Sequence, residues 1–167
     1  MRAEAVESLP VQEATSLPVL DDAAVHRALQ NFFSAVESDD SLFAAESVGA
    51  VSAASASGGT CTGDFVLRFR DARFAANRAL HFSLVERLLE LFRQAGSAPS
   101  LFASLCLSAD AAAETNRAEL RLWLRLEAQG NSLEQAQRRW GLGLAQVQQA
   151  LLFTSRYLRQ QIARDGD

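Results

Sequence analysis

The apolar residues of this chain recur with two periods, and each period predicts a kind of element. Residues 64–70 alternate between apolar and polar side chains, which predicts a half-buried strand. Over 23–37 and again over 74–94, apolar residues recur every three or four positions, which predicts two amphipathic helices. Asp21 and Asp22 offer an N-cap to the first of these helices.

Residues 118–127 carry a conflict between composition and period. Leu, Arg, Glu and Ala favour a helix, yet a helix here would place charges at nearly every angle around its axis. Leucine alternates strictly with charged residues or Trp123, so we predict a strand, with a helix as the alternative. Because residues 101–108 alternate as well, the two segments are expected to pair as a hairpin.

Composition along the chain predicts four regions. Residues 1–21 hold two of the three prolines and no periodic apolar face, so we expect a flexible acidic arm. An amphipathic helix should follow over 22–37. Residues 38–63 are rich in Ala, Ser and Gly, which is typical of a linker. The folded domain is then expected to span 64–167.

Two helices are expected at the C-terminal end. Ser132 and Gln135 have the spacing of a capping box, and the first helix should run to Trp140, before Gly141. The second should run from about 144 to 164. Together these elements predict an α+β fold in which helices predominate, with a small antiparallel β element built from strands near 64–70, 101–108 and 118–127.

Residues 132–151 resemble the helix-turn-helix DNA-binding unit. The match rests on a small residue in the first helix, a glycine in the turn, apolar residues on both sides of the turn, and apolar residues facing inward from the second helix. Those positions are Ala136, Gly141, Trp140, Leu142, Val147 and Ala150. At Gln137 the family usually carries Ala, so the pattern departs there.

The resemblance implies a major-groove recognition helix that begins at 144–151. Glutamine can read the N6 and N7 edge of adenine, and arginines bind phosphates. The DNA-contacting residues it implies are Arg138, Arg139, Ala145, Gln148, Gln149 and Arg156.

Charge is distributed unevenly in a chain whose formal net charge is −4. Residues 1–60 carry −7 and the remainder +3. Within 131–164 the only acid is Glu134, against five arginines. That basic stretch fits either an anionic partner or an ordinary solvated helix surface.

Candidate catalytic chemistry is sparse. His26 and His81 are isolated in sequence, and Cys61 and Cys106 lack metal-ligand or CxxC spacing. We therefore expect no catalytic residues, no metal and no cofactor. The first 20 residues are acidic and no apolar run reaches membrane-spanning length, so we expect a cytoplasmic protein.

Two functions from different classes remain open. The first is a small DNA-associated transcriptional regulator that uses the C-terminal helix-turn-helix. The second is a non-enzymatic adaptor or chaperone-like protein-binding module, for instance of a bacterial secretion or assembly system. We expect a homodimer, because single helix-turn-helix units commonly pair on two half-sites, with strand 64–70 or the hairpin of 101–108 and 118–127 as the dimer contact.

Overall fold

The structure is a computed structural model that describes residues 23–49, 51–55, 58–71, 73–74, 78–96, 99–109 and 118–164. The predicted acidic arm over 1–21 and most of the predicted hairpin loop lie outside these residues.

Three helices and five strands make up the described fold. In chain order they are α1 (Ala23–Val36), β1 (Phe43–Val48), β2 (Ser52–Ala54), β3 (Gly59–Phe69), α3 (Arg78–Gln94), β4 (Ser100–Ala109), β5 (Ala118–Gly130) and α4 (Leu133–Arg164). The predicted helices at 23–37 and 74–94 and the predicted strands at 64–70, 101–108 and 118–127 are all present, each with somewhat different bounds.

The strands form one antiparallel sheet. Its order is β1-β3-β5-β4, and β2 pairs with β3 beyond the end of β1. β3 and β5 are the central strands, and β4 and β5 pair as the predicted hairpin. Residues 118–127 therefore form a strand and not a helix, because β5 is hydrogen-bonded to a neighbouring strand on each side.

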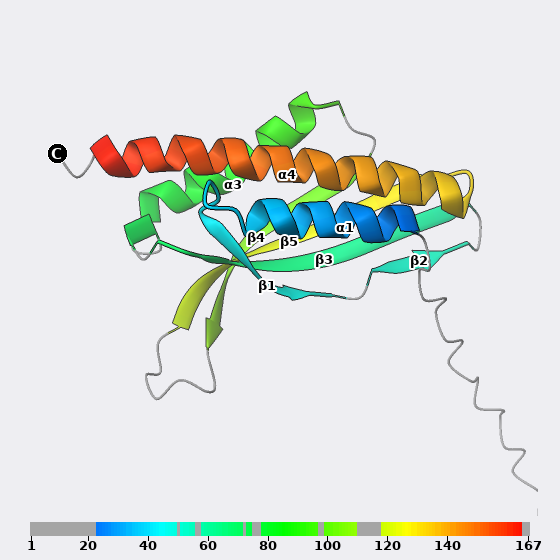
Figure 1. The fold of residues 1–167 in the computed structure, drawn as a ribbon, viewed down its shortest axis with the longest axis horizontal. Helices are drawn as coiled ribbons and strands as arrows, with labels where there is room; N and C mark the ends of the chain where they lie inside the picture. Colours follow the sequence, from blue (N-terminus) through cyan, green and yellow to red (C-terminus); the bar gives the residue numbers. More distant parts are fainter. Residues whose placement is uncertain are drawn as a thin grey trace, which may run out of the picture.

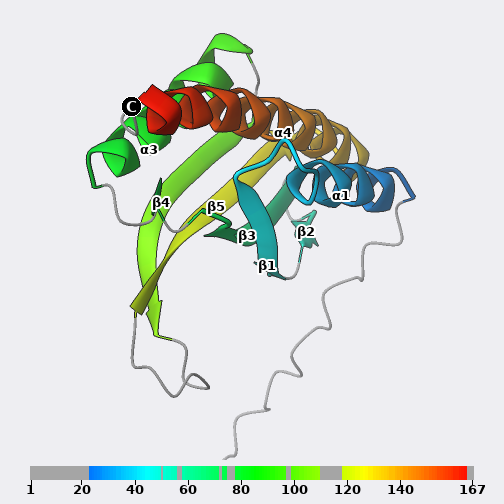
Figure 2. The same cartoon turned by 60° about the vertical axis from the view of Figure 1, so that its left-hand side comes forward.

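All three helices lie on one face of this sheet (Figures 1 and 2). α4 packs over β3 and β5 with α1 on one side and α3 on the other, and α3 also contacts β4. Side chains from the alternate positions of β3 and β5 meet the helices and are buried. The core includes Phe65, Leu67, Leu122, Leu124 and Leu126, each at most 1% exposed.

The expected small β element is wrong, because the sheet has five strands and forms one complete layer of the fold. The expected linker at 38–63 is wrong as well, since it contains β1, β2 and the first residues of β3. Small side chains fit there because these strands lie close to neighbouring elements. Gly59 is an example, for a Cβ at this position would lie 2.2 Å from the carbonyl oxygen of Ser132. α1 packs on the same core, so the folded unit begins before residue 64.

The expected helix-turn-helix pair is also wrong, because α4 is one helix that continues through Gly141. Among the described glycines, only Gly58 and Gly96 have a positive φ, so Gly141 has none of the left-handed backbone that a turn requires. The capping box forms in part: the Ser132 hydroxyl accepts from the Gln135 amide at 3.2 Å, but the Gln135 side chain accepts from the amide of Asn131, at 2.6 Å, rather than from that of Ser132. The helix begins as expected, but it does not end at Trp140.

Trp140 fixes α4 on the sheet. Its side chain is fully buried and its Nε1 donates to the Leu126 carbonyl oxygen at 3.0 Å. The indole stacks on the Phe65 ring and lies over Gly63, where a Cβ would come within 2.6 Å of Cζ2. The residues assigned to packing between two short helices, such as Ala136 and Val147, instead face the sheet in one continuous stripe.

Candidate functional site

The six residues predicted to contact DNA all lie on α4, where Arg138, Ala145, Gln149 and Arg156 share one exposed face and Arg139 and Gln148 lie on either side of it. Arg138 is exposed and pairs with Glu134 at 2.6 Å, whereas Arg139 donates to the Gln129 carbonyl oxygen at 2.8 Å. Gln149 is exposed, and Arg156 lies above the Phe153 ring at 6.0 Å. Three of the six line a groove between α1 and α4: Arg138, Ala145 and Gln148.

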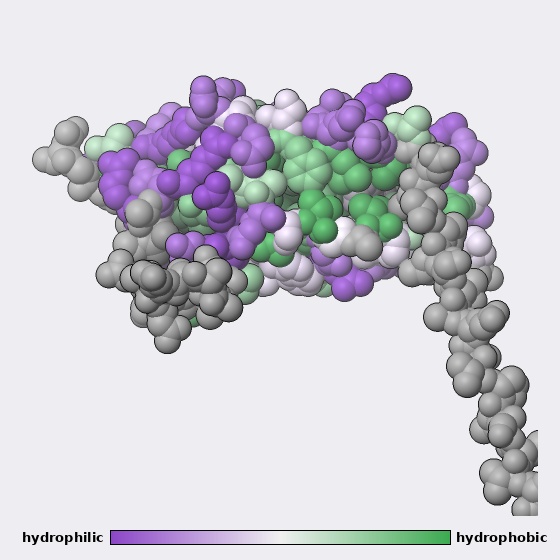
Figure 3. Space-filling model, turned by 60° about the horizontal axis from the view of Figure 1, so that its bottom comes forward, coloured by the Kyte–Doolittle hydropathy of each residue, from purple (hydrophilic) through white to green (hydrophobic). Residues whose placement is uncertain are grey.

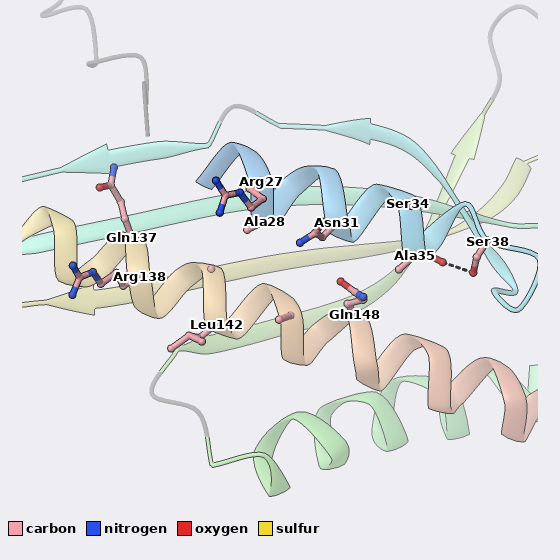
Figure 4. Close-up of a pocket in the computed structure, with 12 residues that line it drawn as sticks. Arg27, Ala28, Asn31, Ser34, Ala35, Ser38, Gln137, Arg138, Leu142 and Gln148 are labelled. Carbon is pink, nitrogen blue, oxygen red and sulfur yellow. Dashed lines mark hydrogen bonds between the residues drawn. The ribbon is translucent and has the colours of Figure 1, made fainter. Parts of the chain in front are cut away.

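That groove has a volume of about 930 Å³ and runs between two helices that point in the same direction (Figures 1 and 4). Its floor is made of small residues, and its walls carry amide, hydroxyl and guanidinium groups. In Figure 4, Asn31 of α1 and Gln148 of α4 project into the space between the helices. The lining residues are Arg27, Ala28, Asn31, Ser34, Ala35, Ser38, Gln137, Arg138, Gly141, Leu142, Ala145 and Gln148.

The free edge of β4 is a second candidate surface. This ten-residue strand pairs only with β5 among the described strands and contains neither a charged residue nor a proline. Phe102 is 57% exposed and Leu107 is 70% exposed. On the neighbouring helix α3, Phe82 is 83% exposed. Long, uncharged, apolar edge strands are templates for pairing with another chain, and native proteins usually protect them.

The opposite edge of the sheet is protected in the usual ways. β1 has six residues and β2 has three, so neither offers a long ladder. The register of β1 against β3 shifts between Ala45 and Ser47, and a charged residue, Glu46, occupies that irregularity. Interruptions and charges of this kind discourage further strand pairing. Among the residues that the structure describes, β4 is therefore the long sheet edge without such protection.

Apolar side chains also gather between α1 and the β1–β2 edge. Leu29 and Phe33 of α1 and Val51 are half-buried, and Val48 is 39% exposed. Figure 3, which turns the lower side of Figure 1 forward, shows hydrophobic residues across the middle of this side and hydrophilic residues around them. Its side chains are less exposed than Phe102 and Leu107 of β4.

The sheet face that no described helix covers carries a buried charge. Arg121 on β5 has a side chain only 8% exposed and forms ion pairs with Glu46 and Glu119. Burial opposes its charge, but the hydrogen bonds to these two carboxylates outweigh burial and raise the pKa of Arg121 above its ordinary value. The arginine therefore joins β1 to β5 across β3, which is a structural role.

Groups that could support catalysis or metal binding are scattered in the part of the chain that the structure describes. No group of three or more His, Cys, Asp or Glu side chains there could hold a metal ion. His26 contacts the Gln30 side chain at 3.1 Å, and His81 Nε2 lies 2.9 Å from the Phe74 carbonyl oxygen. None of the described helices is long and apolar enough to cross a membrane.

Sequence reasoning named the hairpin as a possible dimer contact but missed the residues that make its edge distinctive. The signal was present, since no charged residue occurs between Arg93 and Asp110, a stretch that contains all of 100–109. Phe82, one of the apolar residues whose spacing predicts an amphipathic helix over 74–94, is exposed rather than buried. Comparison with family models, with curated proteins and with solved structures finds no match to this chain.

Proposed function

We propose that this chain is a non-enzymatic protein-binding module of the adaptor or chaperone-like kind, and that it works as a homodimer joined along β4 and α3. The observation that carries the proposal is the free edge of β4, a ten-residue strand without charge or proline. We further propose that the module acts in the cytoplasm, in line with its two widely separated cysteines.

A second copy of the chain fits the β4 edge. The sheet is antiparallel throughout, and a two-fold axis beside β4 would continue it antiparallel from one copy into the other. The same axis would bring the two α3 helices together and cover Phe82. α3 carries both signs of exposed charge, in Glu86, Glu90 and Arg93, so two antiparallel copies can oppose acid to base.

Charged side chains placed in this surface are expected to separate the dimer. Replacing Phe82 and Leu107 by Glu should raise the dissociation constant at least about 100-fold, because burying one large apolar side chain contributes about 1.5–3 kcal/mol and 1.4 kcal/mol is a factor of ten. Analytical ultracentrifugation over a range of protein concentrations measures this, with circular dichroism to check that the variant is folded.

Leu142→Glu supplies the matched control, because Leu142 is 68% exposed but lies on α4 in the α1–α4 groove. It should leave the dissociation constant unchanged. A wild-type protein that sediments as a monomer at 100 μM, or a double variant that still dimerises, would exclude the β4–α3 interface and with it the proposed function.

The DNA hypothesis has lost the motif on which it was based, and it predicts a different result. Phosphate binding by Arg138 and Arg139 would give an affinity that falls steeply with salt and falls again in the Arg138→Ala/Arg139→Ala variant. We expect no salt-dependent binding to duplex DNA in fluorescence anisotropy at about 50 and 200 mM salt. Micromolar binding that the double variant weakens would restore the regulator as the better function.

A further inference from the structure

We infer that the groove between α1 and α4 binds an extended acidic segment of a partner polypeptide. The inference deepens the proposed function, because it names the chemistry of what the module binds at a surface separate from the dimer contact. It rests on the charge, the hydrogen-bonding groups and the dimensions of the groove.

The charge of the groove is opposite to that of the protein. Its lining contains two guanidinium groups, Arg27 and Arg138, and no carboxylate, although the chain as a whole carries −4. Arg27 forms no ion pair with any described residue. Arg138 pairs with Glu134, but both side chains are more than 70% exposed, so this pair is weak and a ligand carboxylate can replace it.

Both arginines lie near the start of their helices. α1 begins at Ala23 and α4 at Leu133, and the two helices run in the same direction, so their N-terminal ends are at the same end of the groove (Figure 1). Figure 4 shows Arg27 and Arg138 towards this end, beside Gln137. The two guanidinium groups therefore favour an anion at this end of the groove.

The rest of the groove suits a peptide backbone. Asn31, Gln137 and Gln148 present amide groups that both donate and accept hydrogen bonds, as a main chain requires. Ala28 and Gly141 form the floor where the two helices approach closely, since a Cβ on Gly141 would lie 3.8 Å from the Ala28 Cβ. From Arg27 to Ala35 the wall of α1 measures about 12 Å at 1.5 Å per residue, which accommodates about four extended residues.

The experiment titrates isotope-labelled full-length protein with a hexapeptide of alternating alanine and glutamate, followed by NMR. We expect saturable shifts of the side-chain amides of Asn31, Gln137 and Gln148. Arg27→Glu/Arg138→Glu should weaken binding at least 10-fold. The matched variant Arg156→Glu/Arg164→Glu makes the same charge change on exposed residues outside the groove and should bind as the wild type does.

Equal binding of an alternating alanine–lysine hexapeptide, or a groove variant that binds as well as the wild type, would overturn the inference. So would shifts of the same amides when Glu4, Glu7 and Glu13 are changed to Gln without any added peptide, because the occupant would then be this chain's own N-terminal segment. A negative result in the peptide titration would not contradict the proposed dimer, since the Phe82→Glu/Leu107→Glu variant tests the dimer contact separately by sedimentation.

Discussion

Replacing Trp140 by alanine is expected to lower the free energy of unfolding by about 3–5 kcal/mol, the usual cost of deleting a large buried aromatic side chain. The indole is fully buried and stacks on the Phe65 ring at a centroid distance of 6.2 Å. Its loss also leaves the Leu126 carbonyl oxygen without the Nε1 donor. Gly63, which lies against the ring, has no side chain with which to fill the space that the indole leaves.

Urea unfolding followed by circular dichroism measures this difference. Leu142→Ala is the control, because this residue lies on the same helix two positions away and is 68% exposed. Its effect should stay within about 0.5 kcal/mol, as for other surface substitutions. If the two variants were equally stable, α4 would not be held on the sheet through Trp140 in the way the structure describes.

Period was the reliable signal in this sequence. Leucine alternation over 118–127 outweighed the helix-favouring composition and correctly predicted β5, because a central strand buries every second residue whatever its intrinsic preference. The same reasoning was not applied to 133–164. There Ala136, Trp140, Leu144 and Val147 continue one buried stripe through Gly141, and this continuity indicates a single helix.

Glycine and small residues misled the prediction in two places. At 38–63 they were interpreted as a linker, whereas Gly59 and Gly63 lie in β3 where α4 approaches the sheet too closely for a side chain. At Gly141 a glycine was interpreted as a turn. Composition alone cannot distinguish a flexible glycine from one required by close packing, because the difference depends on which other element of the fold packs against that glycine.

The candidate site was predictable only in part, since Arg138, Ala145 and Gln148 share the groove but their partners on α1 come from residues more than 100 positions earlier. Nothing local to α4 indicates that Arg27 and Asn31 face it. The β4 edge could be identified only from the strand order, which places this uncharged strand at the outside of the sheet rather than in its middle.

Two glycines of α4 should respond in opposite directions to substitution by alanine. Gly141→Ala should raise the free energy of unfolding by about 0.5–1 kcal/mol, because alanine is the better helix former. The added Cβ would meet only the Ala28 Cβ, at 3.8 Å. At Gly143 a Cβ would lie 2.8 Å from Pro99 Cγ and 3.3 Å from Leu126 Cδ1, so Gly143→Ala should lower the free energy of unfolding.

The size of the second effect follows from two opposing contributions. Overpacking costs about 1–3 kcal/mol, whereas the gain in helix propensity is at most about 1 kcal/mol, so the net change at Gly143 is destabilising. Chemical denaturation of both variants beside the wild type gives the two signs. If the chain turned at Gly141, the Gly141→Ala variant would be less stable than the wild type, since alanine in a left-handed conformation costs about 1–2 kcal/mol. A stabilised Gly141→Ala variant is therefore expected of one continuous helix and is incompatible with a helix-turn-helix.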